Sequence, residues 1–170
     1  MNQLTTQPFP SNIKLVGFDV DGVFTDGRLY LSDDGVESKR FCTQDGFGVR
    51  QLIAAAIDVV VISGRQSAAV ERRMAELGVK YLIQGCKDKV EAFDSVVSAL
   101  AINLADTIYV GDDIPDLELL RHAGFSVAVR NAVAAVKKEC DAITDAKGGY
   151  GAVREVCDRV LEAVSQSEDQ

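Results

Sequence analysis

Two carboxylates that stand one residue apart, Asp19 and Asp21, follow directly after a short apolar run at residues 13–18. Such a run, ending in small and acidic residues, predicts a buried strand that opens into a loop. Two carboxylates this close repel each other strongly unless something neutralises their charge. Such a pair suggests either a bound hard cation or a nucleophile beside its own acid and base. The pair therefore favours chemistry on phosphate.

Three further features are expected to meet this pair. Ser63 and Asp112 each follow another apolar run, at 59–62 and 107–110, and Lys89 stands at the start of an amphipathic segment. In an open α/β sheet, ligands bind outside the carboxyl ends of the strands, so these residues would meet at one edge. Carboxylates suit Mg²⁺, an aspartate can attack phosphorus, and a hydroxyl and an ammonium can stabilise the transferring phosphoryl group.

Each feature alone has an ordinary structural explanation. The string that begins at Asp19 resembles a calcium-binding loop, but Gly22 comes too early for an EF-hand. Lys89 alone would be a solvated helix residue, while Asp112 and Asp116 could cap the following helix and favour its dipole. All of these features occur in one order along the chain, each at the end of its strand or helix that would face the site. Such a combination arises by chance far less often than any one feature alone.

The elements that must position these residues alternate between apolar strands and amphipathic helices. This pattern predicts an α/β fold, a parallel sheet with helices on both faces. A polar loop that ends in Gly35 adds a small β-hairpin after the first strand. We expect strands at 13–18, 28–31, 36–41, 59–62, 81–83, 107–110 and 126–129, and helices at 46–56, 67–77, 88–100, 114–123 and 151–164.

The 170 residues indicate one domain at 13–164, between a polar N-terminal tail at 1–12 and a C-terminal tail at 165–170. The net charge of −8 argues against a nucleic-acid or anionic-membrane partner. No apolar stretch is long enough to span a bilayer, and the N-terminus lacks the layout of a signal peptide. Four widely spaced cysteines and one histidine argue against zinc and against a disulfide framework. We expect a soluble, cytoplasmic protein.

Taken together, these features resemble the motifs of the haloacid dehalogenase-like phosphatase superfamily. The resemblance covers nearly the whole chain from residue 13 onward and implies a Rossmann-like sheet. Its four motifs are matched by Asp19-Val20-Asp21-Gly22-Val23 with Thr25, by Ser63, by Lys89, and by Gly111-Asp112-Asp113 with Asp116.

The superfamily's scheme implies a role for each motif residue. Asp19 would be the nucleophile, and Asp21 would protonate the leaving alcohol and later activate water. The cofactor would be Mg²⁺, held by Asp19, the backbone carbonyl of Asp21 and Asp112, with Asp116 in support. The remaining catalytic residues would be Ser63 and Lys89.

Superfamily members often carry a cap domain, inserted after the first motif or between the second and third. Here only the predicted hairpin follows the first motif. The interval from Ser63 to Lys89 leaves room for one helix and one strand. The resemblance therefore implies a phosphatase with no cap domain.

Further strings resemble one branch of the superfamily, the family of 3-deoxy-D-manno-octulosonate (KDO) 8-phosphate phosphatases of lipopolysaccharide biosynthesis. These strings are Asp26-Gly27-Arg28-Leu29-Tyr30, Thr43-Gln44-Asp45-Gly46 with Arg50, Ile62-Ser63-Gly64-Arg65, Val70-Glu71-Arg72-Arg73 and Gly148-Gly149-Tyr150-Gly151-Ala152-Val153-Arg154-Glu155. The substrate contacts that this resemblance implies come from Asp21, Cys42, Thr43, Gln44, Asp45, Gly46, Arg50, Arg65, Arg73, Lys89 and Arg154.

The same resemblance implies a homotetramer in which the hairpins pack together and a Gly-rich segment at 148–151 closes the site of a neighbouring subunit. Three alternatives stay open. A phosphatase for a related keto-sugar-acid phosphate, of the neuraminate 9-phosphate type, would carry the same motifs. A phospho-acceptor signalling module combines similar groups but orders them differently along its strands. A non-catalytic interaction subunit is the third, although no core catalytic residue is missing.

Overall fold

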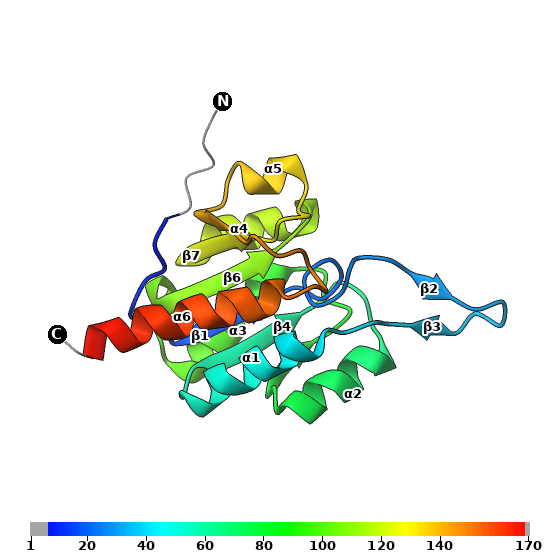
Figure 1. The fold of residues 1–170 in the computed structure, drawn as a ribbon, viewed down its shortest axis with the longest axis horizontal. Coiled ribbons are helices and arrows are strands. Elements are labelled where there is room, and N and C mark those ends of the chain that lie inside the picture. The colour runs from blue at the N-terminus through cyan, green and yellow to red at the C-terminus, as the bar shows by residue number, and fades with distance from the viewer. Residues whose placement is uncertain (1–6, 169–170) are drawn as a thin grey trace.

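A parallel sheet of six strands forms the centre of the computed structural model, which describes residues 7–168 (Figure 1). The strand order is β5-β4-β1-β6-β7-β8, so β1 lies between β4 and β6 where the direction of winding reverses. Such a reversal leaves a crevice at the carboxyl ends of the strands. The strands are β1 (Leu15–Phe18), β4 (Asp58–Ile62), β5 (Tyr81–Ile83), β6 (Thr107–Gly111), β7 (Phe125–Ala128) and β8 (Ala142–Ile143).

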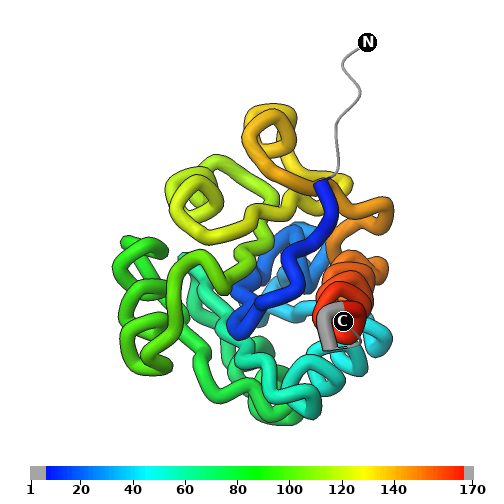
Figure 2. Tube along the Cα trace, turned by 90° about the vertical axis from the view of Figure 1, so that its left-hand side faces the viewer, coloured from blue at the N-terminus to red at the C-terminus, as the bar shows by residue number. Residues whose placement is uncertain are grey.

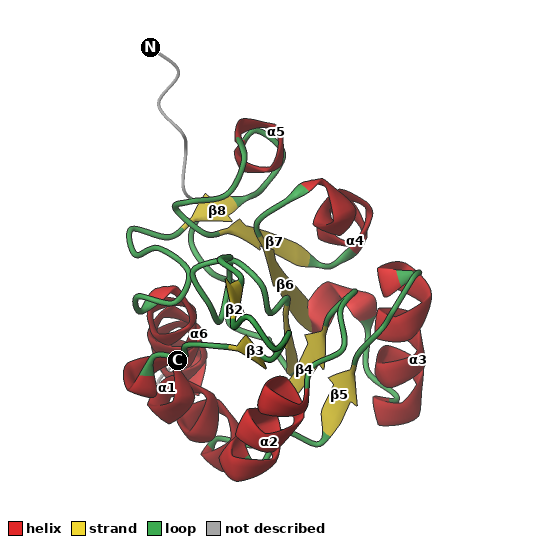
Figure 3. Cartoon of the chain, turned by 90° about the vertical axis from the view of Figure 1, so that its right-hand side faces the viewer, coloured by secondary structure: helices red, strands yellow, loops and turns green. Residues whose placement is uncertain are grey.

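Helices cover both faces of this sheet, as the sequence predicts (Figure 3). Because neither face of the sheet is left to water, every residue of β1 and β6 is buried. One layer contains α1 (Thr43–Ala54), α2 (Ala68–Leu77) and α6 (Ala152–Glu168). The other contains α3 (Lys89–Leu100), α4 (Leu117–His122) and α5 (Ala134–Lys137), with short 3₁₀ turns at Leu104–Asp106 and Ile114–Asp116. None of the described helices is long and apolar enough to cross a membrane.

The predicted hairpin is present and projects from the body of the domain (Figure 1). Its strands are β2 (Tyr30–Leu31) and β3 (Glu37–Ser38). Within residues 7–168 they pair only with each other, in an antiparallel ribbon. They are shorter than the predicted 28–31 and 36–41, because a two-stranded ribbon has no neighbouring strand to extend its pairing. Apolar side chains on the ribbon face water, among them Leu31 at 63% exposure.

Several element boundaries differ from the predicted ones. Helix α1 begins at Thr43 rather than residue 46, because Cys42 already adopts the extended conformation of an N-cap. It ends at Ala54 rather than residue 56, because Ala56 takes a left-handed conformation with φ 59°. The elements β8 and α5 were not predicted, since two and four residues are too short to show a period.

The structure describes part of each predicted tail. The C-terminal tail predicted at 165–170 is helical as far as Glu168, because no glycine or proline stops α6. Of the predicted N-terminal tail, residues 1–6 lie outside the described residues, as do 169–170 at the other end. The remainder of the N-terminal segment crosses the end of the sheet (Figure 2), and the Phe9 ring lies 5.1 Å from the ring of Phe125.

Candidate active site

The carboxyl ends of β1, β4 and β6 meet at a cavity of about 320 Å³. The cavity brings together the residues that the sequence predicts as catalytic or metal-binding, although they are spread over almost a hundred positions. Its lining consists of Asp19, Asp21, Gly27, Ser63, Gly64, Arg65, Lys89, Asp112, Asp113, Pro115 and Asp116.

The loop after β1 is shaped by backbone hydrogen bonds. The Asp19 N–H donates to the Val110 carbonyl at 3.0 Å, which carries the pairing of β1 and β6 one residue further. The N–H groups of residues 23–25 then all donate to the Val20 carbonyl and close a tight turn. Within this turn Gly22 has φ +95°, and a Cβ atom there would overlap the carboxylate of Asp112. Glycine is therefore required for the first and fourth motifs to approach each other.

The Gly-rich segment near the C-terminus braces this same loop. The Gly149 N–H donates to the Val23 carbonyl at 3.0 Å. Asn131 accepts from the Gly148 N–H at 2.6 Å and donates to the Gly22 carbonyl at 3.2 Å. A Cβ at Gly148 would overlap the Gly22 carbonyl. These glycines therefore serve close packing within their own chain, and closure of a neighbouring subunit's site by the same segment stays a prediction.

Lys89 stands between two of the carboxylates. It is the first residue of α3, whose N-cap Asp88 accepts a hydrogen bond from the Glu91 N–H. Its Nζ lies 2.6 Å from Asp19 Oδ1 and 2.7 Å from Asp116 Oδ1. Burial lowers the pKa of Lys89, but the two carboxylates outweigh it and raise the pKa above its ordinary value. The side chain is thus a fixed ammonium group beside Asp19.

Asp116 organises the loop that follows β6. Its Oδ1 accepts hydrogen bonds from Lys89 and from the Tyr109 hydroxyl, the latter at 3.0 Å. Its Oδ2 accepts from the N–H groups of Asp112 at 3.1 Å and Asp113 at 3.3 Å. Sequence reasoning missed Tyr109, because a tyrosine inside an apolar strand looks like an ordinary core residue until α3 and the loop are placed around it.

Three carboxylates in the cavity fit a hard divalent cation. Asp19, Asp112 and Asp116 each offer an oxygen within 4.8 Å of the others. Burial, then repulsion from Asp19 and Asp116, raises the pKa of Asp112 to about 8. Burial and Asp116 also raise the pKa of Asp19, although Lys89 opposes them. One lysine does not balance three carboxylates, and oxygen donors of this kind are the ligands that Mg²⁺ prefers.

The other two predicted catalytic side chains lie at the rim of this cluster. Asp21 turns its carboxylate towards two cations, with Oδ1 2.5 Å from Lys39 Nζ and Oδ2 3.8 Å from Arg65 Nε. Ser63 follows β4 directly, and its Oγ accepts from the Arg65 N–H at 3.2 Å. Lys39 was not predicted, since nothing in its local sequence indicates a contact 18 positions away.

Most of the residues predicted to bind the sugar do not line this cavity. Asp21, Arg65 and Lys89 do line it, but the others lie on α1, α2 and α6 or, for Cys42, at the N-cap of α1. Among these helices the Arg73 guanidinium packs over Gly46. The residues outside the cavity are Cys42, Thr43, Gln44, Asp45, Gly46, Arg50, Arg73 and Arg154.

Asp45 and Arg154 join two helices of the same layer. Asp45 is only 1% exposed, and its Oδ1 accepts a hydrogen bond from the Arg154 N–H at 2.9 Å. The Arg154 guanidinium lies 5.2 Å from the Phe47 ring, and its Nε donates to Asp158 at 2.8 Å. Within this chain the Asp45 carboxylate therefore binds the first turn of α6.

The buried Asp45 carboxyl predicts a pH-dependent stability. Burial raises its pKa from 3.8 to about 6, although the N–H groups of Arg154 and Gly151 lower it. A carboxyl whose pKa is higher in the folded chain makes folding less favourable as the pH rises between those two values. We expect Asp45→Asn to gain stability relative to wild type over this interval, by up to about 3 kcal/mol.

Denaturant unfolding of both proteins at about pH 4 and about pH 7 measures this gain. The quantity compared is the difference in unfolding free energy between the two proteins. The contributions of the other titrating carboxyls are the same in both proteins and cancel. A difference in unfolding free energy that is the same at both pH values would contradict the assignment.

Comparisons with known proteins find relatives over most of this chain. Residues 82–156 match the family model of haloacid dehalogenase-like hydrolases. The 3-deoxy-D-manno-octulosonate 8-phosphate phosphatase of Escherichia coli strain K12 is 43% identical over 152 residues, which cover 89% of this chain and 81% of the relative.

Two solved structures are similar over most of the chain. The 3-deoxy-D-manno-octulosonate 8-phosphate phosphatase of Yersinia pestis superimposes with a TM-score of 0.90 at 40% identity, covering 93% of this chain and 85% of that one. The enzyme of the same name from Moraxella catarrhalis, in complex with a magnesium ion, a phosphate ion and KDO, gives a TM-score of 0.89 at 42% identity. It covers 94% of this chain and 91% of that one.

Proposed function

This chain belongs to the haloacid dehalogenase-like hydrolase family, and we propose that it is a Mg²⁺-dependent phosphatase that releases inorganic phosphate from 3-deoxy-D-manno-octulosonate 8-phosphate. The observation that carries the reaction class is the buried Asp19 carboxylate, held 2.6 Å from Lys89 in a cluster of three acids. The substrate rests on relatives that bear this name, one of them in complex with magnesium, phosphate and KDO. The activity belongs to lipopolysaccharide biosynthesis.

In the first step, a carboxylate oxygen of Asp19 attacks phosphorus and the bond from phosphorus to the sugar oxygen breaks. Asp21 gives its proton to that oxygen, so the sugar leaves as an alcohol. Lys89 reduces the repulsion between Asp19 and the approaching phosphate, and Ser63 donates a hydrogen bond to the phosphoryl group. The product of this step is an aspartyl-phosphate on Asp19.

In the second step, Asp21 takes a proton from a water molecule whose oxygen attacks the phosphorus. The bond from phosphorus to Asp19 breaks, and inorganic phosphate leaves with both side chains restored. Mg²⁺ would be held by Asp19, the Asp21 carbonyl and Asp112, with Asp116 fixing the loop that carries Asp112. When bound, it supplies positive charge beside the phosphoryl oxygens.

We propose that the sugar acid is recognised where subunits of a homotetramer meet. Two observations support this: the predicted sugar-binding residues on α1, α2 and α6 lie outside the cavity of one chain, and the hairpin exposes apolar side chains. A free two-stranded ribbon is marginally stable, so packing against other hairpins would stabilise it. We also propose that the enzyme is located in the cytoplasm. The proposed sugar-binding residues are Asp21, Cys42, Thr43, Gln44, Asp45, Gly46, Arg50, Arg65, Arg73, Lys89 and Arg154.

A phosphate-release assay over a panel of sugar phosphates tests the function. We expect the highest kcat/KM for 3-deoxy-D-manno-octulosonate 8-phosphate, loss of turnover on chelation with EDTA, and recovery when Mg²⁺ is returned. A higher kcat/KM for a neuraminate-type 9-phosphate would change the substrate and keep the reaction. Full activity in EDTA would contradict the metal-dependent reaction itself.

A further inference from the structure

Four charged side chains form a closed ring at the junction between the hairpin and the active site. Lys39 Nζ lies 2.5 Å from Asp21 Oδ1 and 3.0 Å from Glu37 Oε1. Arg65 completes the ring by pairing with Glu37 and with Asp21. The roles proposed above use Asp21 and Arg65 but leave Lys39 and Glu37 without a function.

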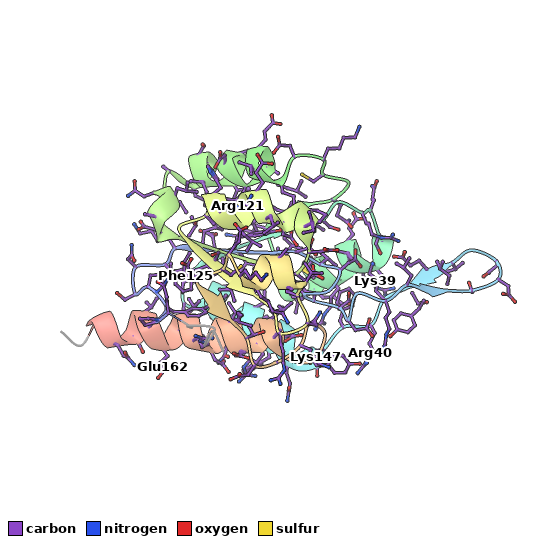
Figure 4. All side chains as sticks on the ribbon, turned by 90° about the horizontal axis from the view of Figure 1, so that it is seen from above. Lys39, Arg40, Arg121, Phe125, Lys147 and Glu162 are labelled. Atoms are coloured by element: carbon purple, nitrogen blue, oxygen red, sulfur yellow. The ribbon has the colours of Figure 1, made fainter. Side chains whose placement is uncertain are left out.

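Lys39 is an unusual member of this ring because its side chain is only 2% exposed. Lysine is almost never buried to this extent unless it is paired, since its ammonium group loses its hydration. Here two carboxylates compensate for that loss. Figure 4 shows Lys39 where the hairpin joins the body of the domain, one residue after β3.

We propose that Lys39 is a positioning residue that holds the carboxyl group of Asp21 in its working orientation. The inference rests on the proposed function, which makes Asp21 the group that exchanges a proton with the leaving sugar oxygen and with water. Lys39 does not line the cavity, so it acts through Asp21 and not on the substrate.

The geometry shows why Asp21 needs such a partner. The terminal torsion of an aspartate has no sharp preferred value, so its own rotamer does not fix the plane of the carboxyl group. Each Asp21 oxygen instead faces a different cation, Lys39 from the hairpin and Arg65 from the loop after β4. Proton transfer requires the donor oxygen within hydrogen-bond reach of the reacting oxygen, so loss of this orientation slows the reaction.

Glu37 in turn fixes Lys39. One of its oxygens accepts from Lys39 and the other from Arg65. The Arg65 side chain is 49% exposed and lines the cavity, so it is free to contact substrate as well. Lys39 is closed off from water and has no such second use.

Two substrates with different leaving groups test this role in Lys39→Met. A sugar phosphate needs a proton from Asp21 to release its alcohol, whereas 4-nitrophenyl phosphate releases a stable phenolate without one. Both need Asp21 in the second step. We expect kcat for the sugar phosphate to fall roughly tenfold to a hundredfold with a smaller change in KM. With 4-nitrophenyl phosphate, we expect a burst of one nitrophenolate per active site, followed by slow turnover.

Matched variants complete the experiment. Lys39→Arg keeps a cation and should recover part of the lost kcat. Lys14→Met removes another lysine paired with an aspartate, Asp106 at 3.0 Å, and should behave as wild type. Unfolding temperatures are measured first, and Lys39→Gln replaces Lys39→Met if the latter does not fold.

Two results would overturn the inference. One is turnover of both substrates by Lys39→Met within about twofold of wild type. The other is loss of the nitrophenolate burst together with turnover, which would make Lys39 a general structural residue. Asp21→Asn, assayed in parallel, distinguishes a failure of the Lys39 inference from a failure of the proposed function. Unchanged turnover in that variant would remove the proposed role of Asp21 itself.

Discussion

Asp19→Asn is expected to lower phosphate release by more than about a thousandfold while the protein stays folded. An amide is a poor nucleophile and a weaker ligand for Mg²⁺ than a carboxylate. The substitution keeps the size of the side chain and removes one of three mutually repelling carboxylates, so we expect the unfolding temperature in the absence of metal to stay the same or rise. Phosphate release and thermal unfolding measure the two effects separately.

Asp58→Asn provides the matched control for this prediction. Asp58 is the first residue of β4 and pairs with Leu15, the first residue of β1. It therefore lies at the amino-terminal ends of these strands, opposite the active site, and its neutralisation should leave turnover unchanged. Near-wild-type phosphate release by Asp19→Asn would remove Asp19 from the mechanism.

Lys89→Ala is expected to lower the rate on the order of a hundredfold or more, as when one preorganised charge-stabilising donor is removed. Its ammonium group contacts both Asp19 and Asp116, so its loss leaves two buried carboxylates without their shared cation. We therefore also expect a lower unfolding temperature, and the rate must be expressed per folded molecule.

The control for Lys89→Ala is Lys87→Ala, an exposed lysine two positions earlier in the chain. Its replacement tests whether a general loss of positive charge near α3 affects the rate. A change of only a fewfold in Lys89→Ala, similar to that in Lys87→Ala, would show that Lys89 is not part of the reaction.

The meeting of Asp19, Ser63, Lys89 and Asp112 could be predicted from the sequence because topology alone brings it about. Each residue follows a buried strand or begins a helix, and parallel strands present their carboxyl ends at one edge. The strand at 81–83 was predicted with the bounds that the structure shows, since turn-forming residues enclose a short apolar run. Hydrophobic period and strand order therefore place the backbone of the site.

The supporting contacts could not be predicted in the same way. The Tyr109 hydroxyl reaches Asp116, and Lys39 reaches Asp21, through side-chain directions that depend on how separate elements pack. Neither contact leaves a periodic trace in the sequence. The elements β8 and α5 were missed for a related reason, since they are too short to show a period.

The glycine-rich segment shows how one residue type can support two interpretations. Glycine permits flexibility, and it also permits close approach of two backbones. From the sequence we expect these glycines to let the segment approach a neighbouring subunit's site, and this stays a prediction. The structure shows close approach, because Gly148 packs on the Gly22 carbonyl of the same chain. Asp45 is a comparable case, since its buried carboxylate binds the start of α6 within the chain.

The formation of a phosphorylated Asp19 is the central claim, and acid-quenched mass spectrometry tests it most directly. The enzyme is mixed with Mg²⁺ and 4-nitrophenyl phosphate, whose leaving group needs no proton from Asp21. The reaction is quenched during turnover, the protein is digested, and the peptide that contains Asp19 is analysed. We predict that this peptide gains the mass of one phosphoryl group in wild type, in larger amount in Asp21→Asn, and not at all in Asp19→Asn. An unmodified Asp19 peptide in Asp21→Asn, with the phosphoryl group on another residue or on none, would contradict the account.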